Sequence, residues 1–238
     1  MDWDFYLITK VGGIAVFIFG GAAMASKSLK ISFGRAVLIN ALAILAGFCV
    51  SRSWYLLQHQ FGGEPYWGGT FIEYWNEAGS VLYGWILGAS VTVYWIVKRA
   101  KLDVIAYTDQ VAPWALIGQF MNRLGCMEAG CCYGKGFSLA FLEAQRPELR
   151  VLYEQLGRQP VQLYEAMVDL SLFTVLLFLL NKKGRATWVY FVGYASARFF
   201  LEFLRGDNQP ALWFMTVPQV TSVLILIVVF RLKNKILL

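Results

Sequence analysis

Long apolar runs constrain the fold of this chain more than any other feature of its sequence. Six runs are dominated by hydrophobic side chains and bounded by polar or charged ones: residues 5–25, 36–57, 81–97, 160–180, 186–204 and 212–230. A hydrocarbon core about 30 Å thick is crossed by roughly 20 residues of helix, so each run is long enough for one span. With 58% hydrophobic residues, 15% charged residues and a mean hydropathy of +0.54, little of the 238-residue chain is left for a soluble domain. The sequence therefore predicts an all-α polytopic membrane protein.

A seventh span is predicted in residues 109–135, where charge, glycine and cysteine crowd together. Pro113 and several glycines predict a broken or kinked helix, which membrane proteins tolerate where protein surrounds it. The segment also holds Asp109 and Arg123. A charged side chain in hydrocarbon is costly, so a membrane protein that keeps one normally uses it. We expect the functional residues to concentrate here.

Basic residues follow every second span. The four predicted inside segments carry three Lys or Arg each: Lys27, Lys30 and Arg35; Lys98, Arg99 and Lys101; Lys182, Lys183 and Arg185; Arg231, Lys233 and Lys235. Because cytoplasmic loops carry an excess of Lys and Arg, we predict seven transmembrane helices with the amino terminus outside and the carboxyl terminus cytoplasmic. The simplest organisation is a single seven-helix domain over residues 1–238, with a small outer segment at about 136–159.

The same pattern excludes nucleic acid as a partner. The net charge of +6 is carried largely by short loops between apolar runs, which is a signature of membrane topology. Cys126, Cys131 and Cys132 raise the question of a metal, but a structural zinc site needs four ligands and the only histidine is His59, in a predicted outside loop. We therefore expect no metal. The cysteines are interpreted as small buried hydrophobic residues, with a catalytic thiol or a disulfide as the alternative.

A polar stripe marks the sixth span. Tyr194, Arg198, Glu202 and Arg205 are spaced by four, four and three residues, which at about 100° per residue puts them on one helix face. Arg123 is the expected partner of this stripe, because a guanidinium binds two phosphate oxygens at once and keeps its charge in a membrane. Two arginines oriented by a carboxylate predict a phosphodiester-binding site. The alternative is an ion-pair network that only joins helices.

Other polar and small residues have a structural interpretation beside the functional one. Gly125 and Gly130 suit close helix packing, and they would also let a lipid headgroup approach the backbone. Asp109 is expected to cap the next helix segment. Glu165 falls in the outer half of its span, at a depth similar to that of Arg123.

Six short motifs follow one another between residues 109 and 205. They are Asp109-x-x-Ala112-Pro113, Gly118-Gln119, Arg123-Leu124-Gly125-Cys126, Gly130-Cys131-Cys132-Tyr133-Gly134-Lys135, Pro160-x-Gln162-Leu163-Tyr164-Glu165 and Tyr194-x-x-x-Arg198-Phe199-x-x-Glu202-Phe203-x-Arg205. In this order they resemble the prolipoprotein diacylglyceryl transferase family, and its cysteine-containing relatives in particular. The resemblance covers about residues 82–219 and five predicted helices.

The resemblance implies a multi-pass enzyme of the bacterial inner membrane whose active site faces the outer leaflet and periplasm. Such an enzyme takes phosphatidylglycerol, or a related anionic phospholipid, and transfers its diacylglyceryl group to the lipobox cysteine thiol of a preprolipoprotein, whose signal peptide is a further expected contact. No metal or organic cofactor is implied.

The resemblance also assigns roles by position. Arg123 and Arg198 match essential arginines of the family, and Tyr194, Glu202 and Arg205 match their neighbours on the sixth span. We therefore expect catalysis from Arg123, Arg198, Glu202 and Tyr83. The residues expected to bind substrate are Arg205, Tyr194, Gln119, Asp109, Glu165, Gly125 and Gly130.

Three positions depart from the motifs of the family. Tyr83-Gly84-Trp85 stands where the family has His-Gly-Gly, and Cys126 and Cys131 stand where it has asparagine and glutamate. A phenol with a reference pKa of about 10 is a poor base, so Tyr83 is expected to donate a hydrogen bond or to orient a group, with an interfacial anchor as the alternative. Transfer to a non-lipoprotein acceptor and a noncatalytic lipid-binding or transport protein remain alternative functions.

Overall fold

The computed structural model describes residues 3–61, 82–136, 157–206 and 215–237. Within these ranges the regular structure is helical, and β pairing is limited to two isolated bridges, Gly134 with Arg205 and Gly136 with Arg158. The all-α prediction is thus confirmed for the described residues. Nearly all of the predicted outer segment at 136–159 lies outside them.

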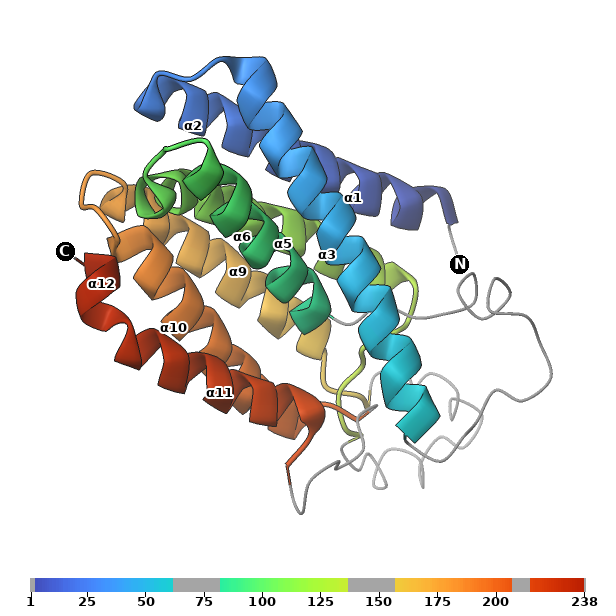
Figure 1. The fold of residues 1–238 in the computed structure, drawn as a ribbon. Coiled ribbons are helices and arrows are strands. Elements are labelled where there is room, and N and C mark those ends of the chain that lie inside the picture. Colours follow the sequence, from blue (N-terminus) through green and yellow to red (C-terminus); the bar gives the residue numbers. More distant parts are fainter. Residues whose placement is uncertain (1–2, 62–81, 137–156, 207–214, 238) are drawn as a thin grey trace, which may run out of the picture. The chain divides into compact units, whose positions relative to one another are not determined.

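The chain divides into two compact units, residues 1–17 with 109–238 and residues 18–108. The first unit holds α1 (Trp3–Ala15), most of α6 (Val104–Glu128), α9 (Val161–Leu179), α10 (Arg185–Leu201), a 3₁₀ turn (Glu202–Leu204), α11 (Val217–Arg231) and α12 (Lys233–Leu237). In this unit α10 packs against both α9 and α11 (Figure 1). The functional candidates on α6, α9 and α10 therefore belong to one compact body.

The second unit is built from α2 (Gly21–Leu29), α3 (Phe33–Phe61) and α5 (Leu82–Arg99), and a π-helical turn (Val16–Gly20) joins α1 to α2. Helices α3 and α5 run side by side at very short range (Figure 1). A Cβ added at Gly84 would lie 2.5 Å from the Ser51 Cα, and one added at Gly88 would lie 2.7 Å from the Ala46 carbonyl oxygen. Glycine is needed at both positions because a side chain would separate the two helices.

Within the described ranges, three helical stretches are long and apolar enough to cross a membrane: Phe5–Leu29, Phe33–Leu56 and Val161–Leu179. Large apolar side chains on these stretches remain exposed, including Phe178 at 80% and Ile8 at 65%. A continuous exposed apolar surface is unfavourable in water and suits contact with lipid. The described residues thus support a membrane protein.

The fourth predicted span is helical without a break over Val104–Glu128, so a break at Pro113 is excluded, whereas a kink there stays a prediction. Pro113 lies inside α6 without interrupting it. Proline removes one backbone donor and crowds the preceding turn, but membrane helices tolerate it when neighbouring groups restore the lost contacts.

The last span begins later than residue 212, the predicted start. Helix α11 begins at Val217, and Thr216 forms a capping box with Gln219, whose backbone N–H lies 3.4 Å from Thr216 Oγ1. In return the Thr216 backbone N–H donates to the Gln219 side chain at 3.0 Å. Pro218 in the first turn strengthens this start signal.

Helices α1 and α6 are in backbone contact within the first unit. A Cβ at Gly13 would lie 2.7 Å from the Gly118 carbonyl oxygen, and one at Gly118 would lie 2.8 Å from that of Gly13. This pair of glycines allows the close approach that small residues give in membranes. It fixes α6, which carries Arg123, against α1.

Candidate functional site

Glu165, buried on α9, joins arginines from three other segments. Its Oε2 lies 2.9 Å from Arg123 Nε of α6, and its Oε1 lies 2.5 Å from Arg198 Nη1 of α10 and 3.6 Å from Arg205 Nη1. The side chain of Glu165 is only 6% exposed. A charge at such depth is stable only when it is paired, so Glu165 ties the three arginines to α9.

Glu202 forms the second carboxylate of this ion-pair cluster. Its Oε2 lies 2.9 Å from Arg198 Nη2 and 3.9 Å from Arg205 Nε. Its Oε1 accepts a hydrogen bond of 2.8 Å from the hydroxyl of Thr216, just before α11. Thr216 was not among the predicted site residues. The capping-box pattern Thr216-x-x-Gln219 could have located it at a helix start, though not its contact with Glu202.

The cluster confirms that Arg123 meets the polar stripe of α10, and the meeting occurs through Glu165. Three guanidinium groups contact two carboxylates in these ion pairs, and the carboxyl group of Asp169, one turn after Glu165 on α9, lies within electrostatic range of Arg123 and Arg198. All three arginines are buried, at 7–8% exposure. Fixed, buried guanidinium groups can take up a phosphate, because each can present two N–H donors to two oxygens.

Tyr194 and Gln119 lie one helical turn from the arginines of the cluster. Tyr194 precedes Arg198 by four residues on α10, is buried and stacks on Tyr190 with ring centroids 6.2 Å apart. Gln119 precedes Arg123 by four residues on α6, and its buried Oε1 lacks a hydrogen-bond partner among the described residues. Residues four apart share a helix face, so Gln119 offers an acceptor beside Arg123.

The segment that follows α6 is held against Arg205 by its backbone. The Lys135 N–H donates to the Leu204 carbonyl at 2.7 Å, and the Gly206 N–H donates to the Tyr133 carbonyl at 3.1 Å. Gly134 is needed there, since its Cβ would lie 2.5 Å from the Gln159 carbonyl oxygen. This pairing fixes the cysteine-containing segment beside the ion-pair cluster.

The end of α6 brings three thiols together. The Cys131 N–H donates to the Cys126 carbonyl and the Gly130 N–H to the Met127 carbonyl, each at 3.2 Å, with Gly130 at a φ of +66°. This is the Schellman arrangement that ends helices at a left-handed glycine, and it folds residue 131 back onto residue 126. The sulfur atoms of Cys126, Cys131 and Cys132 all lie within 4.8 Å of one another.

The three-thiol cluster is partly accessible and lies in a positive environment. Cys126 is buried, whereas Cys131 and Cys132 are partly exposed, and all three are free thiols. Hydrogen bonds from the Cys126 and Cys131 thiols, with the charges of Arg205 and Arg123, lower the pKa of the Cys132 thiol below its ordinary value. The expectation of small buried hydrophobic residues therefore describes Cys126 alone.

The two glycines among the predicted substrate-binding residues have structural roles. A Cβ at Gly125 would clash with the hydroxyl of Thr9, so this glycine lets α1 pack against α6. Gly130 supplies the left-handed turn at the end of α6 and has open space around its Cα. Approach of a headgroup to the backbone is thus possible at Gly130 and blocked by α1 at Gly125.

Asp109 caps a helix, but not the next segment of its own span. It lies inside α6, where its Oδ2 accepts from the Gly184 N–H at 2.6 Å. Its Oδ1 accepts from the backbone N–H and from the hydroxyl of Thr187, both at 2.7 Å. These bonds cap the start of α10. The capped end lies about 20 Å from Arg198 along the helix axis, at a rise of about 1.5 Å per residue. The carboxylate is occupied there, away from the ion-pair cluster.

Tyr83, the remaining predicted catalytic residue, belongs to the second unit. It lies in the first turn of α5 and is 5% exposed. A side chain buried to this extent differs from an interfacial anchor with its ring among headgroups. Its part in catalysis stays a prediction.

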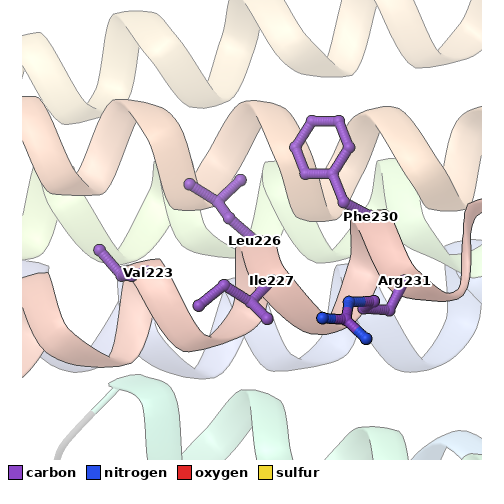
Figure 2. A pocket seen from close by; sticks show the side chains of 5 residues that line it. All are labelled: Val223, Leu226, Ile227, Phe230 and Arg231. Carbon is purple, nitrogen blue, oxygen red and sulfur yellow. The ribbon is translucent and has the colours of Figure 1, made fainter.

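A hollow of about 560 Å³ lies along α11, apart from the charged residues on α10. Figure 2 shows that its lining side chains all come from this one helix: Val223, Leu226, Ile227, Phe230 and Arg231. They follow Thr216 by 7 to 15 residues, which is about 10–22 Å along the helix axis. An apolar lining with one arginine has none of the paired charges that chemistry on a phosphate requires.

The sequence is similar to a known protein family and to proteins of several bacteria. The sequence model described as prolipoprotein diacylglyceryl transferase matches residues 3–232. A Clostridium tetani protein named phosphatidylglycerol–prolipoprotein diacylglyceryl transferase is 31% identical over 153 residues, which cover 63% of this chain and 61% of that protein. A Clostridium perfringens protein of the same name, numbered 2, is 32% identical over 157 residues, covering 63% and 59%.

A longer match exists at lower identity. The Clostridium novyi protein of the same name is 25% identical over 233 residues, which cover 92% of this chain and 89% of the relative. The chain therefore spans about three fifths of the first two relatives and nearly all of the third.

Proposed function

Because the chain belongs to the prolipoprotein diacylglyceryl transferase family, we propose that it is a membrane transferase that moves the diacylglyceryl group of phosphatidylglycerol to the lipobox cysteine thiol of a prolipoprotein. The observation that carries this proposal is the buried cluster of Arg123, Arg198 and Arg205 around Glu165. The names of the relatives supply the donor and the class of acceptor.

The chemistry of the transfer fits an arginine-rich site. The acceptor sulfur attacks the glycerol carbon that carries the phosphate ester, the carbon–oxygen bond breaks, and its electron pair stays on the departing glycerol phosphate. Negative charge grows on the phosphate as this bond breaks. Arg123 and Arg198 hold that phosphate and stabilise its growing charge, which is the electrostatic term that dominates such reactions.

The other candidates position the arginines or bind the headgroup. Glu165 and Glu202 hold the guanidinium groups in place. Gln119 accepts a hydrogen bond from a headgroup hydroxyl, because its buried Oε1 lacks a partner among the described residues. Tyr194 lines the same helix face, and Tyr83 donates a hydrogen bond to a reacting group.

The proposed setting is the bacterial inner membrane. Seven spans with the amino terminus outside put Arg123, Glu165 and Glu202 in the outer leaflet, where phosphatidylglycerol and the signal peptide of a preprolipoprotein both reach the site. The charge pattern of the loops and the three apolar helices support this arrangement.

A different acceptor is the second candidate function. Tyr83 stands in place of the family histidine, and Cys126 and Cys131 stand in place of its asparagine and glutamate, so the acceptor is the part of the reaction that these departures put in question. A protein that transfers the same lipid-derived group to a glycan, a lipid or a small molecule would keep the arginines. A noncatalytic lipid-binding protein would keep them as well.

The proposal is tested by incubating the purified protein with isotopically labelled phosphatidylglycerol and a lipobox peptide, and by identifying the products by mass spectrometry. We expect a diacylglyceryl group to replace the hydrogen of the cysteine thiol, which adds the mass of diacylglycerol less one water, with release of glycerol phosphate. Glycerol phosphate released without peptide modification would indicate another acceptor. Phospholipid binding without any product would leave only the noncatalytic function.

A further inference from the structure

The three-thiol cluster of Cys126, Cys131 and Cys132 lies beside the arginines, and none of its thiols has a role in the transfer proposed above. We propose that these cysteines hold one zinc ion, whose open fourth position binds the acceptor thiol as a thiolate. This inference rests on the proposed function, because it assigns the way in which that reaction activates its acceptor.

The arrangement of the sulfur atoms suits zinc. Zinc–sulfur bonds of about 2.3 Å in a tetrahedral site separate the sulfur atoms by about 3.8 Å. The three sulfur atoms lie within 4.8 Å of one another, so a shift of about 1 Å or less brings them to one metal ion. Soft thiolate ligands favour zinc over harder cations such as Mg²⁺ or Ca²⁺.

The number of ligands points to a reactive site. The sequence prediction of no metal assumed the four protein ligands of a structural site, but catalytic zinc keeps three protein ligands and one open position. Cys126 is buried, whereas Cys131 and Cys132 are partly exposed. The cluster is therefore closed by protein around Cys126 and accessible around the other two thiols.

The segment that carries these cysteines is fixed in place. The Schellman turn at Gly130 joins residue 131 to the end of α6, and Gln162 Nε2 donates to the Cys131 carbonyl at 2.7 Å. The Lys135 N–H bond to Leu204 ties the following residues to the Arg205 region. Ligands held in advance in this way bind a metal at little further conformational cost.

The reaction needs an activator of the thiol, because the thiolate and not the thiol is the nucleophile. Glu165 and Glu202 are already engaged by arginines at 2.5–2.9 Å, and the carboxyl group of Asp169, one turn after Glu165 on α9, is only 1% exposed. A coordinating thiol is deprotonated by the metal itself, so zinc supplies what these residues do not.

The step balances without any oxidant or reductant. The acceptor thiol binds zinc and its proton passes to water. Its sulfur then attacks the glycerol carbon, the carbon–sulfur bond forms, and the carbon–oxygen bond breaks with its electron pair on glycerol phosphate. The product thioether is uncharged and a weak ligand for zinc, so it leaves and the fourth position becomes open again.

The position of the cluster matches this sequence of events. Cys126 follows Arg123 by three residues on α6, which puts both on one helix face. A sulfur bound at the cluster is then held beside the arginines that hold the phosphate. Bringing nucleophile and leaving group together in this way is a large part of the catalysis available to a bimolecular transfer.

Metal content is the first test, because it does not depend on activity. The full-length protein is purified in detergent under reducing conditions from zinc-supplemented cells, and zinc is measured by mass spectrometry. We expect about one zinc per chain, and at least a several-fold loss in Cys126→Ser, Cys131→Ser and Cys132→Ser. Cys49→Ser is the matched control, since Cys49 is an exposed cysteine of α3 outside the cluster, and it should keep its zinc.

A second variant separates loss of a ligand from loss of folding. Cys131→His replaces one zinc ligand by another, so it should keep much more zinc than Cys131→Ser while both show the elution volume of the wild type. Wild-type protein without zinc, or cluster variants that keep all of it, would overturn the inference.

Cobalt substitution tests the open position. Protein loaded with Co²⁺ should show thiolate charge-transfer and tetrahedral ligand-field absorption, and a lipobox peptide with its cysteine should change this spectrum. The same peptide with serine in place of cysteine should leave it unchanged. A spectrum that does not respond to the cysteine peptide would refute the role of zinc in thiol binding.

The two proposals fail in different ways. If the cysteine peptide is modified equally well by the wild type and by Cys126→Ser, the transferase function stands and the zinc inference is wrong. If the protein binds zinc and the peptide thiol but modifies no lipobox peptide, the zinc site stands and the acceptor named in the proposed function is wrong.

Discussion

Glu165 shows how much the site depends on a single carboxylate. Its two oxygens contact Arg123 and Arg198 at 2.9 and 2.5 Å, and Arg205 lies 3.6 Å away. Removing one partner of a buried ion pair costs about 3–5 kcal/mol, because the other charge is left uncompensated. A cluster of this kind is costly to keep in an apolar helix bundle, and this cost is a reason to propose that its arginines serve a ligand.

Conservative changes of the two arginines test the phosphate site. Arg123→Lys and Arg198→Lys keep the charge but lose the planar pair of donors, so each should lower turnover on the order of a hundredfold. The measurement is release of glycerol phosphate from labelled phosphatidylglycerol. Arg35→Lys, an exposed position of the predicted cytoplasmic loop, is the control and should retain full activity. Near-normal turnover in both site variants would mean that the phosphate binds elsewhere.

Substitution of Asp109 should lower the stability of the fold without changing lipid binding at the ion-pair cluster. Asp109→Ala removes three hydrogen bonds at the start of α10, and we expect a loss of about 3 kcal/mol in the free energy of unfolding. The exposed cap Asp103, which accepts from the N–H groups of Ile105 and Ala106, is the comparison. Asp103→Ala should cost about 1 kcal/mol.

Thermal unfolding in detergent measures both aspartate variants. Below the unfolding transition, Asp109→Ala should bind phosphatidylglycerol as the wild type does. A folded Asp109→Ala protein with strongly weakened lipid binding would return this residue to the substrate-binding group.

Tyr83 can be tested without assuming where its hydroxyl lies. If it donates a hydrogen bond to a reacting group, Tyr83→Phe should lower turnover about tenfold, the effect of roughly 1.4 kcal/mol in the transition state. The assay is peptide modification at saturating lipid, with the unfolding temperature as the check on folding. Unchanged turnover across the pH range would leave Tyr83, which is 5% exposed, as a packing residue of α5.

At the scale of single helices, the backbone contact of α1 with α6 in the first unit is sensitive to added side-chain volume. Gly118→Val would force side-chain atoms into the backbone of Gly13, whose carbonyl oxygen lies 2.8 Å from a Cβ at residue 118. We expect a loss of about 1–3 kcal/mol, measured by thermal unfolding in detergent. Gly34→Ala is the control, because a Cβ there has no heavy atom within 4 Å, and it should leave stability unchanged or slightly higher. Equal effects of both changes would argue against the tight contact.

The helices could be predicted because their signal is local. Apolar runs and basic loops placed most spans within a few residues of an observed helix, and the spacing of Arg198, Glu202 and Arg205 predicted a shared face. The fourth span was predicted at residues 109–135, but its helix is Val104–Glu128. Pro113 was expected to break or kink this helix, but proline removes only one backbone hydrogen bond, and the helix continues through it. The predicted start of the last span was residue 212, where the apolar run begins. The helix α11 starts at Val217, because the capping box of Thr216 and Gln219 fixes its first turn there.

The site was predictable in part. Charges that are rare in an apolar chain identified Arg123 and the α10 stripe, but no sequence rule states that Glu165 would hold both arginines, because their separation along the chain carries no distance information. The three-thiol cluster was missed for another reason. The sequence argument required four protein ligands, as in a structural zinc site. The turn at Gly130 instead brings Cys131 and Cys132, five and six residues further along the chain, next to Cys126.

The proposed reaction requires one transmembrane topology of the chain. Phosphatidylglycerol and a translocated lipobox cysteine meet only at the outer face, so the end of α6 and the start of α9 must face outward while the basic segments after α2 and α11 face the cytoplasm. Arg158, next to the start of α9, is exposed, and so are Ser28 and Lys233. Replacing Arg158 by cysteine removes its contact with the Tyr133 ring, which lies 4.3 Å from the guanidinium carbon, so retained folding of this variant is checked by its elution volume.

Labelling from each side of the membrane tests this topology. In intact cells, a membrane-impermeant maleimide should label Arg158→Cys and leave Ser28→Cys and Lys233→Cys unlabelled, and inverted vesicles should give the reverse. Because Cys131 and Cys132 are partly exposed thiols, the parent protein must be labelled in parallel and its signal subtracted. Labelling of Arg158→Cys only from the cytoplasmic side would place the arginines in the inner leaflet. The outer-leaflet site would then be wrong, since the acceptor thiol of a translocated lipoprotein could not reach it.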